Sequence, residues 1–324
     1  MTGLSPITSH RPLGRGDSST GELPTRVFVT GASGHLGSAV VPELLQAGHE
    51  VVGLARSEAS AAALTALGVE VRRGDLDDLD GLREAASAAD GVIHLAFKHE
   101  AMFAGDFASA VAADGAAVQA LADALAGTGK VFVGVSGTLA LAGLGRTGTE
   151  DDMLEAGPRS AATDMVLGLA ERGVRSSVVR LPPVVHSTLD RHGFIPTLIG
   201  IARAAGVSGY VGDGANRWPA GHVLDAGRLY RLALEKAPAG SRLHAVGDEG
   251  VPVRQIAETI GRHLGVPTAS IPAEQAQAHF SFLAPFMTAD NPTSSALTQQ
   301  LLDWKPEHPG LIADLDQGHY FTTE

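Results

Sequence analysis

Cysteine is absent from the 324 residues of this chain, which excludes a disulfide framework, a thiol nucleophile and a thiolate-bound metal. Basic side chains are in the minority: 24 Lys and Arg stand against 36 Asp and Glu, a net charge of −12. The few basic residues form no cluster, and this argues against a nucleic-acid partner or an anionic membrane surface. Runs of apolar residues stay below the ~18 needed to cross a bilayer. We therefore expect a cytoplasmic protein with a small-molecule substrate, no nucleic-acid partner and no membrane partner.

A signal-peptide core is also missing from the beginning of the chain. Residues 1–24 contain Ser, Gly, Pro, Thr and two Arg, but no apolar stretch. We expect a flexible N-terminal extension there. The remainder is rich enough in hydrophobic residues, which make up 44% of the chain, to build a large core.

The most informative segment that is present is TRVFVTGASGHLG, residues 25–37. A β-branched and aromatic run over 26–30 predicts a buried strand, and helical periodicity follows over 35–47. Three glycines at three-residue spacing lie between them: Gly31, Gly34 and Gly37. Glycines in this position let the chain turn tightly and let a phosphate approach the backbone at a helix N-terminus. The segment therefore predicts a diphosphate cradle.

Strands and helices alternate after residue 24, which predicts an α/β fold with a doubly wound parallel sheet of the Rossmann type. Predicted strands cover residues 26–30, 50–56, 70–75, 91–97, 130–136, 175–185 and 242–246. Predicted helices cover 35–47, 61–67, 107–125, 162–171, 196–205, 223–236, 253–264 and 295–302. We expect a dinucleotide-binding domain over 25–185. Residues 186–324 are expected to form a small C-terminal substrate lobe interleaved with the last sheet strands.

The GxxGxxG spacing after Thr30 resembles the extended and atypical short-chain dehydrogenases/reductases, the epimerase/dehydratase-like branch of that superfamily. Further matching segments extend the resemblance over most of residues 25–310. Five segments, of which the glycine turn is the first, match the family pattern in order, and the resemblance implies that they bind a nicotinamide dinucleotide and its substrate. The residues implied around the diphosphate are Gly31, Ser33, Gly34, His35, Leu36 and Gly37, with Asp75 and Leu76 near the adenine. Ala96 and Phe97 would line the ribose and diphosphate, and Pro183 and Val184 would form the nicotinamide wall.

The end of the second predicted strand carries Arg56 and Ser57, where NAD-preferring enzymes usually place an acid. A guanidinium at this point suits the 2′-phosphate of NADP, which it can hold through two hydrogen bonds. The alternative is a solvated surface arginine. We expect NADPH as the cofactor, with NADH also possible.

The resemblance fails at the family's Tyr-x-x-x-Lys pair, whose matching positions are about Gly157 and Ala161. The hydroxyl residues before it are kept: Thr138 would polarise the substrate carbonyl, and Ser136 would sit closer to the cofactor. A proton donor must then come from elsewhere, and His186, directly after the sixth predicted strand, is the first choice because histidine titrates near neutrality. Arg159 could hold an anionic substrate group. His94, in mid-strand, is predicted to be a satisfied core histidine.

Three functions stay open on these grounds. The first is an NADPH-dependent reductase of a small aldehyde, ketone or imine with a non-standard proton donor. The second is a catalytically silent NAD(P)-binding sensor, and the third is a nucleotide-sugar epimerase or dehydratase. The histidines are dispersed and lack metal-ligand spacing, so no metal site is predicted. A homodimer is plausible by analogy with the family.

Overall fold

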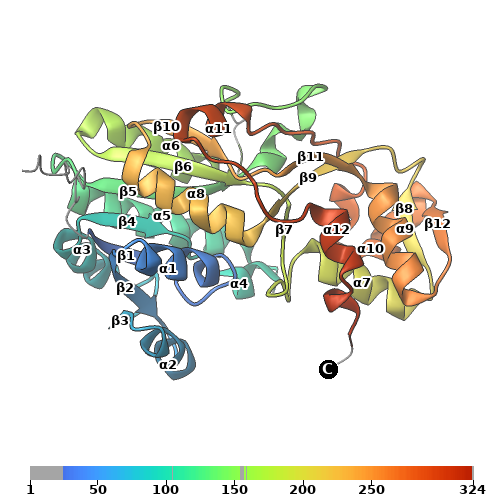
Figure 1. Cartoon of the computed structure of the whole chain (residues 1–324), viewed down its shortest axis with the longest axis horizontal. Helices are drawn as coiled ribbons and strands as arrows, with labels where there is room; N and C mark the ends of the chain where they lie inside the picture. The colour runs from blue at the N-terminus through green and yellow to red at the C-terminus, as the bar shows by residue number, and fades with distance from the viewer. Residues whose placement is uncertain (1–24, 104, 154–156, 158, 323–324) are drawn as a thin grey trace, which may run out of the picture.

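A seven-stranded parallel sheet organises the molecule, in the order β10-β6-β5-β4-β1-β2-β3. The computed structural model describes residues 25–103, 105–153, 157 and 159–322, so the extension predicted over 1–24 lies outside the described residues (Figure 1). The strands are β1 Arg26–Thr30, β2 Glu50–Ala55, β3 Glu70–Arg73, β4 Gly91–His94, β5 Val131–Gly137, β6 Arg175–Leu181 and β10 Ser241–His244. The predicted doubly wound Rossmann sheet is confirmed.

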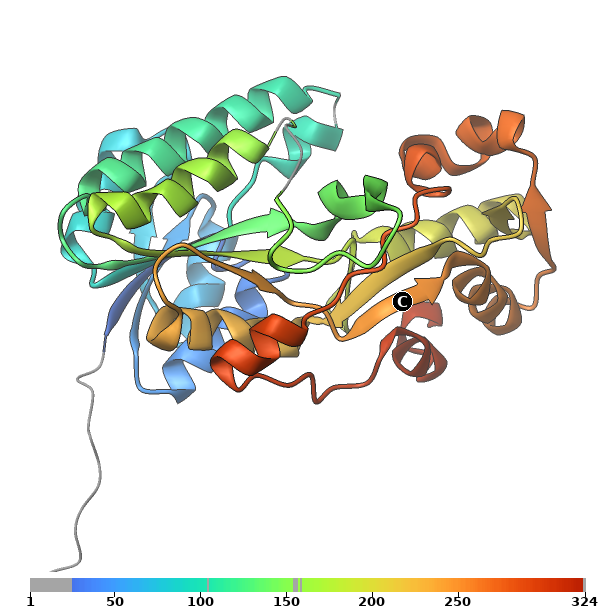
Figure 2. The same cartoon turned by 90° about the horizontal axis from the view of Figure 1, so that it is seen from above.

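Helices cover both faces of this sheet, as Figure 2 shows. One face carries α3 Leu79–Ala88, α5 Phe107–Leu125 and α6 Ser160–Gly168, and the other carries α1 Gly37–Gln46, α8 Val223–Lys236 and α11 Ala296–Leu302. The short helices α2 Glu58–Ala66 and α4 His99–Phe103 connect neighbouring strands. Because both faces are covered, the central strands read as nearly continuous apolar runs rather than as alternating ones. Phe28 and Val29 point to opposite faces and are both fully buried.

A second lobe extends from one end of the sheet (Figure 1). Its strands are β7 Val184–His186, β9 Arg217–His222 and β11 Asp248–Pro252 in one small sheet, and β8 Ser208–Val211 and β12 Thr268–Ile271 in another. Its helices are α7 Phe194–Ala205, α9 Val253–Leu264, α10 Ala276–Phe280 and α12 Leu311–Asp316. Short 3₁₀ turns cover Thr138–Leu144, Leu169–Arg172, Ala273–Gln275, Ser281–Phe286 and His319–Phe321. Trp218 is fully buried in the core of this lobe and donates its indole N–H to the carbonyl of Phe286 at 3.2 Å.

Several strands of this lobe differ from the prediction, and β11 and β12 were not predicted at all. The single strand predicted over 175–185 is wrong, because β6 ends at Leu181 and β7 belongs to a different sheet. Pro182 and Pro183 separate the two strands, since proline cannot donate a ladder hydrogen bond. The segment 186–221, in which the only predicted element is the helix over 196–205, also contains β8 and β9. Both are short, and glycine and proline within them hide the apolar alternation.

The second half of the chain returns to the first at several points. β10 completes one edge of the main sheet, and α8 packs against α1. Trp304 is buried in the hydrophobic cluster that also contains Val40 of α1 and Leu229 of α8, and it donates its indole N–H to the Asp225 carbonyl at 3.0 Å. The Asp225 carboxylate accepts from the backbone N–H groups of Glu307 and His308. Within the described ranges, none of the helices combines the length and apolarity that a bilayer crossing requires.

Candidate functional site

The glycine turn after β1 has the geometry that the sequence predicts. Gly31 has φ of +69°, and a Cβ there would lie 2.8 Å from the backbone nitrogen of Ala96. A Cβ on Gly37 would lie 2.3 Å from the carbonyl oxygen of Gly31. Contacts this close to backbone atoms cannot relax, so both positions require glycine. The turn is thereby held against the end of β4.

The N-terminus of α1 is open toward an anion. The N-cap residue is Leu36, and no side chain among the described residues forms a cap hydrogen bond at this helix end. The first turn also has no acidic residue. The uncapped N–H groups and the helix dipole therefore remain available for a phosphate. Ser33 and Gly34 are exposed beside them, and His35 and Leu36 are half-buried. Crowded glycines and an uncapped helix fit the diphosphate of a dinucleotide.

Arg56 lies at the end of β2, and Ser57 begins the next helix. The Arg56 guanidinium is largely exposed and forms an ion pair with Glu100 at 2.7 Å. Ser57 is the N-cap of α2, and its hydroxyl accepts from the backbone N–H of Ser60. Because both side chains are exposed, the ion pair between Arg56 and Glu100 is weak. A phosphate at the adenosine ribose, which the position of Arg56 suits, could therefore replace Glu100 as its partner.

Asp75 and Leu76 follow β3. An oxygen of the Asp75 carboxylate accepts from the Asp77 backbone N–H at 2.8 Å, so this side chain already stabilises a turn. Leu76 is buried in the core under α3. The structure therefore gives both residues a local structural role, and contact with adenine stays a prediction.

The two hydroxyl residues at the end of β5 have different surroundings. Thr138 is fully buried, its hydroxyl donates to the Asn291 side-chain oxygen at 3.3 Å, and the Asn291 amide donates back to its carbonyl. Ser136 is half-buried and accepts from the Thr163 hydroxyl at 3.1 Å. Of the two, Ser136 is the more accessible to a substrate, because Asn291 covers Thr138.

A buried polar chain leads from the glycine turn to Arg159. The Thr30 hydroxyl oxygen accepts from the backbone N–H groups of Leu95 and Ala96, so its own proton donates to His94 Nδ1 at 2.8 Å. His94 Nε2 then carries a proton and donates to Asp114 at 3.3 Å. This satisfies both nitrogens of His94 and confirms it as a core histidine.

Asp114 links this chain of hydrogen bonds to Arg159. Its second oxygen lies 3.5 Å from the guanidinium of Arg159. Arg159 also stacks over the Phe97 ring at 4.2 Å, and Phe97 is one of the residues implied to contact the cofactor. Both positions that match the missing tyrosine and lysine, Gly157 and Ala161, are exposed, with Arg159 midway between them. A cation held by Asp114 and Phe97 therefore lies, in the sequence, between the two positions that match the family's tyrosine and lysine.

His186 lies in a different environment from the one expected of a proton donor. Its ring is fully buried, and Nδ1 lies 2.8 Å from an oxygen of Asp314 in α12. Pro183 is half-buried and Val184 belongs to the core of the second lobe. A substrate could reach the His186 ring only if the C-terminal helix moved.

Another buried histidine, His244, joins β10 to the C-terminal segment. His244 Nδ1 donates to the Ser294 carbonyl at 2.7 Å, and Nε2 accepts from Arg180 at 3.4 Å. Burial lowers the pKa of His244 to about 4, against partial opposition from the nearby Glu150 charge. The native state therefore holds this ring neutral.

This histidine makes stability depend on pH. The unfolded chain takes up a proton near pH 6.5 and the native chain only near pH 4, so stability is full above pH 6.5 and is lost as pH falls toward 4. The loss from His244 is on the order of 3 kcal/mol. Urea unfolding at pH 7 and pH 4.5 should show a smaller pH-dependent loss in His244→Gln than in wild type. The exposed His192→Gln is the control, and an equal loss in both variants contradicts the assignment.

Comparison with known proteins identifies the family. The profile of the "NAD dependent epimerase/dehydratase family" matches residues 27–246, more than half of the chain, and the chain belongs to that family. Relatives named as dehydrogenases and reductases match segments of it, which supports an NAD(P)-dependent oxidoreductase of the short-chain dehydrogenase/reductase type. "Uncharacterized protein C2A9.02" of Schizosaccharomyces pombe is 46% identical, covering 91% of this chain and 100% of the relative. "Uncharacterized protein YLL056C" of Saccharomyces cerevisiae is 43% identical, covering 90% and 97%.

Solved structures share the fold at low sequence identity. UDP-glucuronic acid 4-epimerase from Bacillus cereus, in complex with UDP-glucuronic acid and NAD, superposes with a TM-score of 0.71 at 18% identity. It covers 91% of this chain and 98% of its own. The dTDP-glucose 4,6-dehydratase DesIV from Streptomyces venezuelae superposes with a TM-score of 0.70 at 20% identity, over 90% and 96% of the two chains.

Sequence analysis did not predict two features of the site. Asn291 covers Thr138 although the two residues are 153 positions apart, and no local sequence pattern indicates such a partner. The fold also brings together His186, His222 and Asp314, which are dispersed along the sequence. Their separation along the chain conceals the grouping, since spacing rules detect only ligands on one helix or turn.

Proposed function

We propose that the protein is an NADPH-dependent reductase of a small aldehyde, ketone or imine. The observation that carries this proposal is the pairing of an intact dinucleotide cradle with a fixed cation, Arg159, beside the implied cofactor-binding residue Phe97. A relative named 2-alkyl-3-oxoalkanoate reductase, from Stenotrophomonas maltophilia, is 26% identical over 75% of this chain and 76% of its own. Its name supports carbonyl reduction as the reaction class.

Arg159 and Ser136 have different roles in the proposed reaction. The nicotinamide supplies the hydride, which goes to the carbonyl or imine carbon. Arg159 donates N–H groups to the substrate heteroatom and stabilises the negative charge that develops there, because Asp114 and Phe97 fix its guanidinium. Ser136 adds a hydroxyl donor from β5. A guanidinium is a poor proton donor, so the product oxygen, or the nitrogen where the substrate is an imine, takes its proton from water.

Turnover tests the proposal directly. Purified protein with NADPH and a panel of aldehydes, ketones and cyclic imines should consume NADPH, followed by its near-ultraviolet absorbance. Tight NADPH binding with no oxidation across the panel would favour the silent sensor. Conversion of a nucleotide sugar without net NADPH consumption would favour an epimerase or dehydratase.

The cofactor preference has its own test in Arg56→Ala. We expect NADPH affinity to fall ~10- to 100-fold, the loss of one charge-assisted contact, while NADH affinity changes by less than about threefold. Glu100→Gln should tighten NADPH binding, because Glu100 competes for the same guanidinium. Fluorescence titration measures both, and Arg83→Ala is the matched exposed control. Equal weakening of NADPH and NADH binding would remove Arg56 from the phosphate site.

A further inference from the structure

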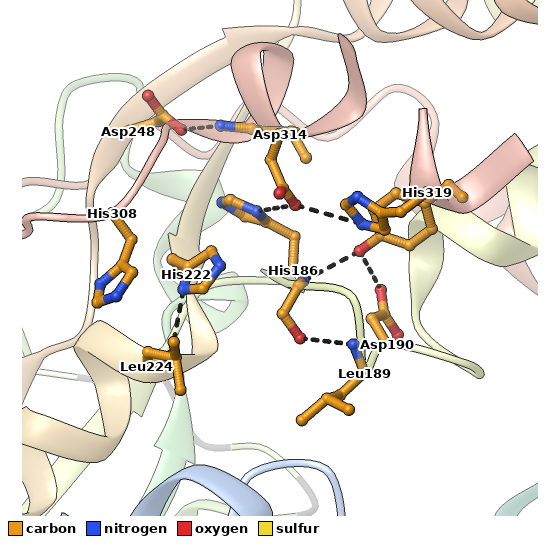
Figure 3. A network of polar contacts seen from close by, with 12 residues as sticks. His186, Leu189, Asp190, His222, Leu224, Asp248, His308, Asp314 and His319 are labelled. Atoms are coloured by element: carbon orange, nitrogen blue, oxygen red, sulfur yellow. Dashed lines mark hydrogen bonds and ion pairs between the residues drawn. The ribbon is translucent and has the colours of Figure 1, made fainter. Parts of the chain in front are cut away.

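Two histidines and an aspartate meet in the second lobe, here called the histidine–aspartate cluster: His186, His222 and Asp314 (Figure 3). They come from β7, the end of β9 and α12. One ligand atom from each lies within 4.8 Å of the others. His186 and Asp314 are buried and His222 is half-buried, so the group is enclosed by protein.

Hydrogen bonding in and beside the cluster is incomplete. His186 Nε2 is buried and, among the described residues, has no hydrogen-bond partner. Within the described chain, both ring nitrogens of the neighbouring His319 are likewise buried without a hydrogen-bond partner. His319 Nε2 does lie 3.8 Å from the Asp314 carboxylate. Buried polar atoms are paired in more than about nine of ten cases. The unpaired buried nitrogens of His186 and His319 therefore call for a ligand.

The chemical types in the cluster suit a cation, because two imidazoles and one carboxylate offer nitrogen and oxygen donors at one place. Imidazole nitrogens together with a carboxylate are donors that Zn²⁺ and similar ions prefer.

We propose that His186, His222 and Asp314 bind a divalent transition-metal ion of the Zn²⁺ type. Three protein ligands leave a fourth tetrahedral position, which His319 or a water molecule fills. The ion joins β7, the β9–α8 junction and the C-terminal helix α12, which are separated in sequence. Its role is to fasten the end of the chain onto the second lobe.

Binding exchanges one contact of the metal-free protein. The Leu224 backbone N–H donates to His222 Nδ1 at 3.3 Å, so the neutral ring carries its proton on Nε2. Coordination through Nε2 requires the other tautomer and gives up this long cap bond of α8. Coordination through the unpaired His186 Nε2 leaves the 2.8 Å contact of Nδ1 with Asp314 in place.

Cobalt provides a direct probe of this site. Untagged full-length protein, dialysed against chelator, should take up one equivalent of Co²⁺ with the visible d–d absorption of a four-coordinate complex. Zn²⁺ should bleach that absorption, and Mg²⁺ should not, because Mg²⁺ prefers oxygen ligands. Zn²⁺ should also raise the thermal unfolding midpoint, since it binds only the folded chain.

Variants assign the binding to the cluster. His222→Gln, at a half-buried position, should fold and should weaken Co²⁺ binding at least about tenfold; Asp314→Asn should do the same. His263→Gln is the matched control, because His263 in α9 also pairs with an aspartate, Asp316. Co²⁺ binding that persists unchanged in His222→Gln would overturn the proposal. So would the failure of wild-type protein to develop the cobalt absorption.

Discussion

Gly37→Ala should abolish measurable cofactor binding and lower the free energy of unfolding by at least about 2 kcal/mol. The new Cβ would meet the backbone oxygens of Gly31 and Ala32 at 2.3 and 2.4 Å. These oxygens belong to the glycine turn itself and cannot swing aside as a flexible side chain could. Relief requires α1 to move away from β1, which dismantles the diphosphate cradle.

Gly115→Ala is the control for that variant. Gly115 lies inside α5, and a Cβ there meets nothing within 4 Å among the described atoms. Alanine should therefore stabilise the protein by ~0.5–1 kcal/mol and leave cofactor binding unchanged. Isothermal titration with NADPH and urea unfolding give the two readouts. Wild-type NADPH affinity in Gly37→Ala would show that the cofactor does not use this turn.

Arg159→Leu should reduce turnover about 100- to 1000-fold while cofactor affinity stays within about threefold. This is the usual loss when one donor to a developing oxyanion is removed. Arg159→Lys should recover part of the rate, because it keeps the charge but lacks the two-pronged geometry. Steady-state kinetics with the best carbonyl substrate measure kcat, and fluorescence titration measures NADPH binding.

Asp114→Asn separates positioning from charge in the same test. The variant keeps a hydrogen-bond acceptor for His94 but loses the ion pair that orients Arg159. We expect kcat to fall by about tenfold with little change in fold. Arg172→Leu, an exposed arginine paired with Asp123, is the control and should have wild-type kinetics. Unchanged kcat in Arg159→Leu would remove Arg159 from the reaction and leave Ser136 as the remaining donor at the strand ends.

The sequence predicted the parts of the site that depend on neighbouring residues. Gly31 and Gly37 could be recognised because a strand, a tight turn and a helix follow one another directly. The polar chain from Thr30 to Arg159 could not be recognised, because Asp114 lies in the middle of α5, where an acid usually faces solvent. Likewise, the burial of His186 depends on Asp314, whose position only the folded C-terminal segment determines. Long-range pairing of polar groups was the information that local patterns lacked.

The return of Trp304 to the first half of the chain has a consequence for how the protein matures in the cell. Val27 of the first strand and Trp304 belong to the same hydrophobic cluster. A chain still emerging from the ribosome therefore lacks one large member of this cluster until Trp304 has been synthesised. Native packing of the cluster is completed only after that point, and chains that stop before Trp304 leave apolar side chains of the cluster exposed to other nascent proteins and to chaperones.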